Sequence, residues 1–170
     1  MKNNDITDAS IDDALEVRIV ELEAMKVAVV HADGEAPEKE AWEKLRAYAN
    51  PNDLFADVEA HPVFGFNNPG PRPNRKEYGY ELWIRVDPEA EPEKDVELKD
   101  FPGGLYAVAS CKLFGDPKGS IVEIWQKLSA WVHDHESNYT WRETHELEKV
   151  LNPLAPEEDF VLELYLPVAE

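Results

Sequence analysis

The sequence predicts an α+β fold in which one small unit of strands and a helix occurs twice. Two strand-like stretches, 78–86 and 160–168, carry the main signal because apolar and polar residues alternate along both. Residues 81–86 align with residues 163–168 without a gap, which indicates an internal duplication. Each stretch follows a segment with helical spacing of apolar residues, so each half is predicted as strand, strand, helix, strand, strand.

The first half, 17–86, is expected to follow a loose, acidic arm at 1–16. Its helix is predicted to begin at Pro37, a residue favoured in the first helical turn, and to end at Asn50-Pro51. The remaining elements are strands at 17–22, 25–31, 63–66 and 78–86, a turn at 32–34 and a loop at 67–73.

The second half, 96–168, is expected after an acidic connector at 87–95. Ser120 followed by Glu123 is the pattern of a capping box, and the apolar residues of 121–132 recur at helical spacing. Since each helix has one apolar stripe, both helices should cover one face of the sheet and leave a cleft between the halves on the opposite face. The strands are predicted at 96–101, 105–113, 146–151 and 160–168, with a turn at 102–104 and a loop at 115–119.

The composition describes a globular and strongly acidic chain. Of its 170 residues, 36 are Asp or Glu and 17 are Lys or Arg, which gives a net charge of −19. Phosphate backbones and anionic lipids repel such a chain, so direct binding to nucleic acid or membranes is not expected. Suitable partners are cations and basic or DNA-bound proteins, although the acidity also fits a merely soluble surface. The single cysteine, Cys111, excludes an internal disulfide, and no targeting or membrane segment is recognised, so a cytoplasmic location is expected.

The polar sides of the two duplicated strands provide the candidate site. Glu81 and Trp83 stand on one strand, and Glu163 and Tyr165 stand at the aligned positions of the other. A carboxylate among aromatic rings attracts a cation, to which each ring adds roughly 0.5–2 kcal/mol. Two simpler interpretations remain open, since Glu81 also fits a solvated strand residue and Trp83 also fits ordinary packing.

Other aromatic residues are candidates for the walls of the cleft. Trp42 and Trp125 lie on the apolar stripes of the helices and are predicted to be core residues. Trp131, near the end of the second helix, fits either packing or a pocket wall. The remaining candidate walls lie on loops or short strands and are Phe66, Tyr139 and Trp141.

Five stretches together carry a family resemblance. They are Tyr-Gly-Tyr-Glu-Leu-Trp-Ile-Arg-Val at 78–86, Phe-Pro-Gly-Gly-Leu-Tyr-Ala-Val at 101–108, the helical stretch 121–131, Leu-Glu-Lys-Val-Leu-Asn-Pro at 147–153, and the strand 162–168. In this order, and with the duplication, the chain from about residue 17 to residue 168 resembles the GyrI-like small-molecule-binding domain. That domain is also called the AraC-type or bacterial transcription activator effector-binding domain.

The resemblance implies a duplicated βαββ-type unit, a curved antiparallel sheet of about eight strands, two helices and a pocket between the halves. It also implies binding of amphipathic, often cationic, organic compounds near an acidic residue on the pocket floor. The matching motif places that acid at Glu148, with Glu81 as a secondary acid. Val150 stands where the family commonly has a tyrosine, so one aromatic wall of the pocket is expected to be missing.

Three functions from different classes remain open at this stage. The favoured one is a stand-alone module that senses or sequesters an amphipathic cation, because the arm at 1–16 is too short for a DNA-binding region. The second is an interaction protein that modulates gyrase. The third is a hydrolase of strained organic compounds, with Glu148 or Glu81 as general base. The chain offers no Ser-His-Asp set for this third function. No cofactor is expected, and no metal either, since there is no metal signature and His133 and His135 would diverge on a helix.

Overall fold

The computed structural model describes residues 16–112, 117–134 and 137–170. Within these ranges the chain forms two α-helices, α2 (Pro37–Ala49) and α3 (Pro117–His133), and two short 3-10 helices, η1 (Leu54–Ala56) and η2 (Glu157–Asp159). It also forms nine strands, which are β1 (Arg18–Leu22), β2 (Met25–Gly34), β3 (Val63–Asn67), β4 (Tyr78–Arg85), β5 (Glu97–Phe101), β6 (Gly104–Lys112), β7 (Thr140–Trp141), β8 (Leu147–Val150) and β9 (Val161–Ala169). The predicted arm at 1–16 lies outside the described residues, apart from Glu16.

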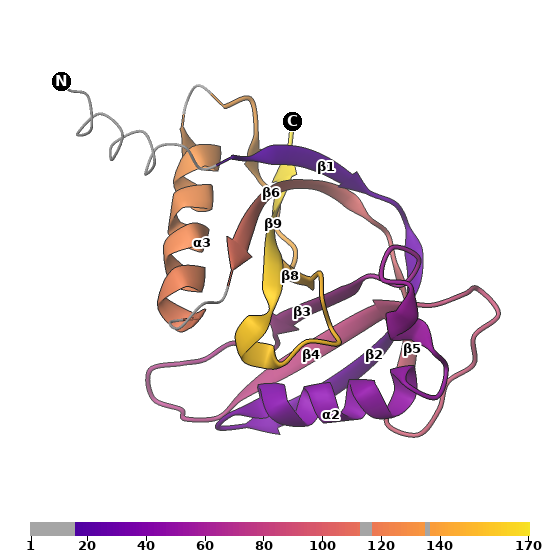
Figure 1. Cartoon of the computed structure of the whole chain (residues 1–170). Helices are drawn as coiled ribbons and strands as arrows, with labels where there is room; N and C mark the ends of the chain where they lie inside the picture. The colour runs from indigo at the N-terminus through magenta and orange to yellow at the C-terminus, as the bar shows by residue number, and fades with distance from the viewer. Residues whose placement is uncertain (1–15, 113–116, 135–136) are drawn as a thin grey trace.

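Eight of these strands form one strongly curled antiparallel sheet, which has the shape of a half-barrel (Figure 1). The strand order is β1-β6-β9-β8-β3-β4-β2-β5, and the short β7 pairs with the end of β9. The predicted α+β class and the curved sheet are therefore confirmed.

The strand order contains the duplication predicted from the sequence. The strands correspond in pairs, β1 with β5, β2 with β6, β3 with β8 and β4 with β9. When the two members of every pair are exchanged, the result is the observed strand order read from the other edge of the sheet. A pseudo-twofold axis therefore relates the two halves, and it passes between the two central strands, β3 and β8. We call this β3–β8 junction the seam.

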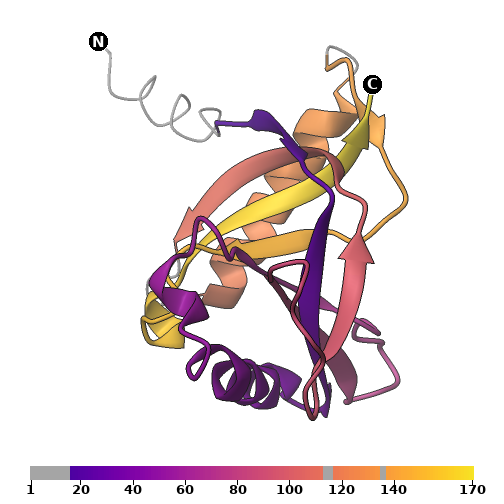
Figure 2. The ribbon, with the colours of Figure 1, turned by 90° about the vertical axis from the view of Figure 1, so that its right-hand side faces the viewer.

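The two helices cover the same face of the sheet, one in each half (Figure 2). α2 packs on β2 and β4, and α3 packs on β6 and β9. The core on this helix-covered face is aliphatic for the most part, and includes Val30, Leu45, Leu82, Ile84, Leu128, Leu164 and Leu166. The core on the opposite face is richer in aromatic rings, and includes Val27, Val29, Phe64, Trp83, Phe101, Tyr106 and Tyr165.

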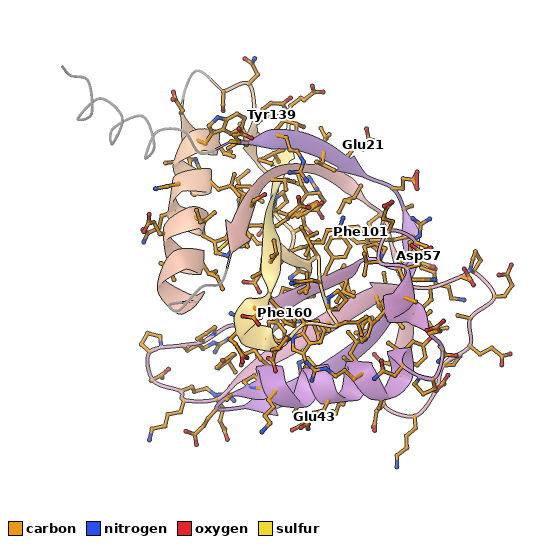
Figure 3. The ribbon with its side chains drawn as sticks, viewed as in Figure 1. Glu21, Glu43, Asp57, Phe101, Tyr139 and Phe160 are labelled. Atoms are coloured by element: carbon orange, nitrogen blue, oxygen red, sulfur yellow. The ribbon has the colours of Figure 1, made fainter. Side chains whose placement is uncertain are left out.

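Trp42 connects α2 to the second half of the chain. Its ring lies 5.0 Å from the ring of Phe160, which precedes β9 and is seen above α2 in Figure 3. The prediction that Trp42 is a core residue is confirmed, because only 3% of its surface is exposed. This contact buries one helix against both repeats.

Three details of the predicted secondary structure are wrong. The turn at 32–34 is instead the end of β2, because these residues pair with Tyr80, Gly79 and Tyr78 of β4. The second helix, predicted from the Ser120 pattern, begins earlier, at Pro117, so part of the predicted loop at 115–119 belongs to α3. β7 was not predicted, since two residues are too few to show an alternating pattern. Neither described α-helix has the length and apolarity needed to cross a lipid bilayer.

The Trp42 contact provides a test of the packing between the halves. Replacing Trp42 by Ala should lower the free energy of unfolding by about 3–5 kcal/mol, because it opens a cavity between α2 and Phe160. Leu154, which is 72% exposed, is the matched control, and Leu154→Ala should change the same quantity by less than about 0.5 kcal/mol. Urea denaturation measures both, and a small effect of Trp42→Ala would contradict the described packing.

Candidate ligand-binding site

The candidate site begins with one residue pair on the pseudo-twofold axis. Gly65 pairs with Leu82 in the first half, and Glu148 pairs with Leu164 in the second. Leu82 and Leu164 are equivalent in the aligned repeats, so Gly65 and Glu148 are equivalent too. They also pair with each other across the seam, which places this pair on the axis.

The seam is formed on only one side of this pair. There the ladder continues through Phe64–Lys149 and Val63–Val150. Symmetry would require the pairs Phe66–Leu147 and Asn67–Glu146 on the other side, and the ladder between β3 and β8 contains neither. The two halves therefore separate at the point where the symmetric ladder would continue.

A pocket with a volume of about 290 Å³ lies where the halves separate, and we call it the seam pocket. Both halves contribute to it, and its only helical residue is Trp125 of α3. The residues that line it are Phe66, Asn67, Trp125, Trp141, Thr144, His145, Glu146 and Glu148.

Glu148 is the best-defined polar group of the seam pocket. Burial raises the pKa of its carboxyl to about 7, even though hydrogen bonds from the Tyr80 hydroxyl and the Trp125 indole stabilise the charged form. The Tyr80 hydroxyl lies 3.2 Å from Oε1 of Glu148. Burial, and then the charge of Glu148, raise the pKa of Tyr80 well above its usual value, so its hydroxyl remains protonated and donates.

Gly65 provides the space for this hydrogen bond. A Cβ atom at position 65 would lie within 2.9 Å of Cζ of Tyr80 and closer still to the hydroxyl oxygen. Any larger residue would therefore displace the tyrosine from Glu148. The glycine on one side of the axis and the glutamate on the other together make the site asymmetric.

Glu81 and Glu163 lie on the opposite face of the sheet from Glu148. On β3, Phe66 pairs with Glu81, and the preceding residue, Gly65, pairs with Glu148. Neighbouring residues of a strand face opposite sides of the sheet, and so do the residues that pair with them. The prediction that Glu81 and Glu148 share one hollow is therefore wrong. The cleft was predicted to open on the face away from the helices, but the seam pocket draws on both faces, because Trp125 of α3 lines it from the helix-covered side and Phe66 belongs to the core on the opposite face.

Both acids on the opposite face have a cationic partner within the protein. Glu81 lies 3.6 Å from Nζ of Lys99 and accepts a 2.6 Å hydrogen bond from the Trp83 indole. Glu163 lies 2.5 Å from the Arg18 guanidinium. Glu81 is only 6% exposed, so the interpretation as a solvated strand residue is wrong.

The aromatic candidates are divided between packing and the pocket. Trp83 and Tyr165 belong to the aromatic core on the opposite face, so Trp83 does contribute to ordinary packing. Phe66 lines the seam pocket, where its ring stacks on His145 at 4.3 Å and meets Trp83 edge-on at 5.0 Å. Trp141 also lines the seam pocket and is 47% exposed.

The last two aromatic candidates lie elsewhere. Trp131 and Tyr139 stack on each other with their ring centroids 6.3 Å apart, near the end of α3 (Figure 3). Neither is among the residues that line the seam pocket.

Five lining residues were not candidates at the sequence level. Trp125 was assigned to the core because it lies on the apolar stripe of its helix, and only the fold shows that its indole reaches Glu148. Glu146 was detectable, because it stands two residues before Glu148 and strand alternation puts such residues on one side. The last three gave no periodic signal, and these are Asn67, which ends β3, and the loop residues Thr144 and His145.

Similar structures support the fold. EcmrR in a complex with DNA superposes with a TM-score of 0.67 and 13% identity, over 98% of this chain and 63% of the EcmrR chain. The present chain thus spans less than two thirds of that relative. A hydrolase from Listeria innocua gives a TM-score of 0.59 and 14% identity, over 91% of this chain and 92% of that one. SAV2435 bound to tetraphenylphosphonium gives a TM-score of 0.52 and 11% identity, over 91% of this chain and 94% of the SAV2435 chain.

Sequence comparison identifies the family. No curated protein matches the chain. The family model for Cass2, the integron-associated effector binding protein, matches residues 18–168, which is nearly the whole chain. The resemblance to an effector-binding domain inferred from the motifs is confirmed by this match and by the shared fold. The chain therefore belongs to the family of integron-associated effector binding proteins.

Proposed function

We propose that this chain binds an amphipathic organic cation in the seam pocket, with Glu148 as its counter-charge. The observation that carries this proposal is a half-buried carboxylate, Glu148, that has no cationic partner among the described residues. Among the ion pairs of the described residues, none involves Glu148, whereas Glu81 and Glu163 are paired with Lys99 and Arg18. A ligand cation would supply the charge that the protein omits on this face.

The walls of the seam pocket suit an organic cation with aromatic or apolar parts. Trp125, Trp141 and Phe66 bring three aromatic rings to a small cavity. A cation over such a ring gains roughly 0.5–2 kcal/mol, more when it is desolvated. The volume of about 290 Å³ is near the lower end for ligand pockets, which favours a compact ligand.

The relatives give independent support at the level of the fold. SAV2435 shares this fold and binds tetraphenylphosphonium, a lipophilic cation. EcmrR carries the same fold within a longer chain that occurs in a complex with DNA. We therefore propose two uses for ligand binding here, sequestration of the compound or sensing that is passed to a basic or DNA-bound protein partner.

A hydrolase is the second candidate function. It is favoured by the pKa of about 7 at Glu148, which suits a general base near neutral pH, and by the adjacent Tyr80 hydroxyl. The Listeria innocua relative is described as a hydrolase. In this function Glu148 would take a proton from water as the water oxygen bonds to a carbon of the strained ring and the ring carbon–oxygen bond breaks, and the released alkoxide would then take that proton from Glu148.

The first prediction tests the position of the cation. Tetraphenylphosphonium should quench tryptophan fluorescence, and Glu148→Gln should weaken its binding by about 10- to 100-fold because the counter-charge is lost. Glu81→Gln is the matched control on the opposite face and should change the dissociation constant less than about twofold. If Glu81→Gln weakened binding and Glu148→Gln did not, the ligand would lie on the opposite face.

The second prediction concerns pH and stability. The pKa of Glu148 is raised from 4.5 to about 7 in the folded protein, so the folded state holds more protons than the unfolded state between these values. Its contribution to stability therefore falls as pH rises through this window, by about 2–3 kcal/mol. The Glu148→Gln protein should not show this pH-dependent loss of stability. It should be more stable than the unsubstituted protein at about pH 8, but not at about pH 4.5. Urea denaturation at several pH values tests this, and parallel curves for the two proteins would contradict it.

The third prediction separates binding from hydrolysis. If the chain is a hydrolase, it should open aryl epoxides or similar three-membered rings, and Glu148→Gln should lose turnover by at least about 100-fold. Product formation is followed by chromatography. Absence of turnover by the unsubstituted protein, together with binding of tetraphenylphosphonium, would exclude hydrolysis of these compounds and leave the binding function.

A further inference from the structure

The seam pocket contains a second carboxylate besides Glu148. Glu146 also lines it and stands two residues earlier in the chain. Glu146 directly precedes β8, which begins at Leu147, and residues two apart in an extended segment lie roughly 6.5–7 Å apart. Glu146 is exposed at the entrance, whereas Glu148 is more buried.

Within the described part of the chain, no fixed cation neutralises these two acids. Among the described residues, neither Glu146 nor Glu148 takes part in an ion pair with a lysine, an arginine or a histidine. Among the lining residues that the structure describes, the one basic side chain is His145, which stacks on Phe66. Partial desolvation raises the pKa of Glu146, and burial raises that of Glu148 to about 7, as expected for acids without a nearby cation.

The two ends of the seam pocket differ in chemistry. At Glu148 the neighbours are the Trp125 indole and the Tyr80 hydroxyl. Glu146 is preceded directly by Thr144 and His145, and Asn67 lines the pocket from β3. The inner end thus suits an aromatic or apolar cation, and the entrance suits a group with N–H donors.

We infer that the seam pocket selects compact cations that carry two positive groups, one for Glu148 and a second, with N–H donors, for Glu146. The two groups should be separated by roughly 6–8 Å, in keeping with the spacing of the two residues. This inference rests on the proposed function and makes Glu146 the residue that distinguishes dications from monocations.

A matched pair of probes tests this inference. 4-Methylbenzylamine carries one ammonium group, and 1,4-bis(aminomethyl)benzene carries the same ring with a second ammonium group in place of a hydrogen. Calorimetry at low salt should show that the second compound binds the protein about 10-fold more tightly than the first. Glu146→Gln should reduce this ratio to about twofold and leave the affinity for the monoamine nearly unchanged.

The negative charge of the whole chain favours dications everywhere, so the control must remove one charge from outside the pocket. Glu143 is exposed, close in sequence and not among the lining residues, and Glu143→Gln should keep the 10-fold ratio. If Glu146→Gln and Glu143→Gln changed the ratio of diamine to monoamine affinity equally, or if neither changed it, the selection by Glu146 would be refuted. Binding of the monoamine would still support the proposed function in that case. If neither amine nor tetraphenylphosphonium bound, the proposed function and the inference would fail together.

Discussion

The structure depends on how two copies of one unit are joined at the seam. Only three residue pairs connect β3 to β8, and the Gly65–Glu148 pair lies on the pseudo-twofold axis. A symmetric junction would continue equally on both sides of that pair. Here it stops on one side, and the two strands separate there. The seam pocket therefore results from the duplication together with the missing strand pairing on one side of the axis. No insertion or extra domain is needed to form it.

The distribution of charge follows the two faces of the sheet. On the opposite face, Lys99 of β5 reaches Glu81 of β4 across β2, and Arg18 of β1 reaches Glu163 of β9 across β6. The two acids occupy equivalent positions in the repeats, but their cations do not, because Arg18 pairs with Val108 of β6 whereas Glu97, not Lys99, pairs with the equivalent Val29 of β2. Glu148 on the helix-covered face has hydrogen-bond donors but no cation among the described residues. Its raised pKa lowers stability at neutral pH, and a cost of this kind is common at binding sites.

The sequence predicted most of the elements but misplaced the site. Alternation along 78–86 and 160–168 identified the apolar face of each strand, and the structure confirms it in the core residues Leu82, Ile84, Leu164 and Leu166. The same alternation made Glu81 and Trp83 attractive candidates, yet Lys99 and Trp83 satisfy Glu81 from within the protein. Glu148 entered only through the family resemblance, because a four-residue strand is too short for a clear pattern. Trp125 was taken for a core residue, since its place on the apolar stripe is typical of one.

The sequence by itself determined the local structure, the two-faced pattern of each strand and the duplication, because these properties depend on neighbouring residues and on a repeat within the chain. Only the tertiary structure decided which faces of different strands meet, because a shift of one residue in register moves every side chain to the other face. The tertiary structure also decided which acids are neutralised, since the partner of Glu163 is Arg18, 145 residues away. The chain thus encodes its acids locally, but long-range pairing gives cations to Glu81 and Glu163 and none, among the described residues, to Glu148.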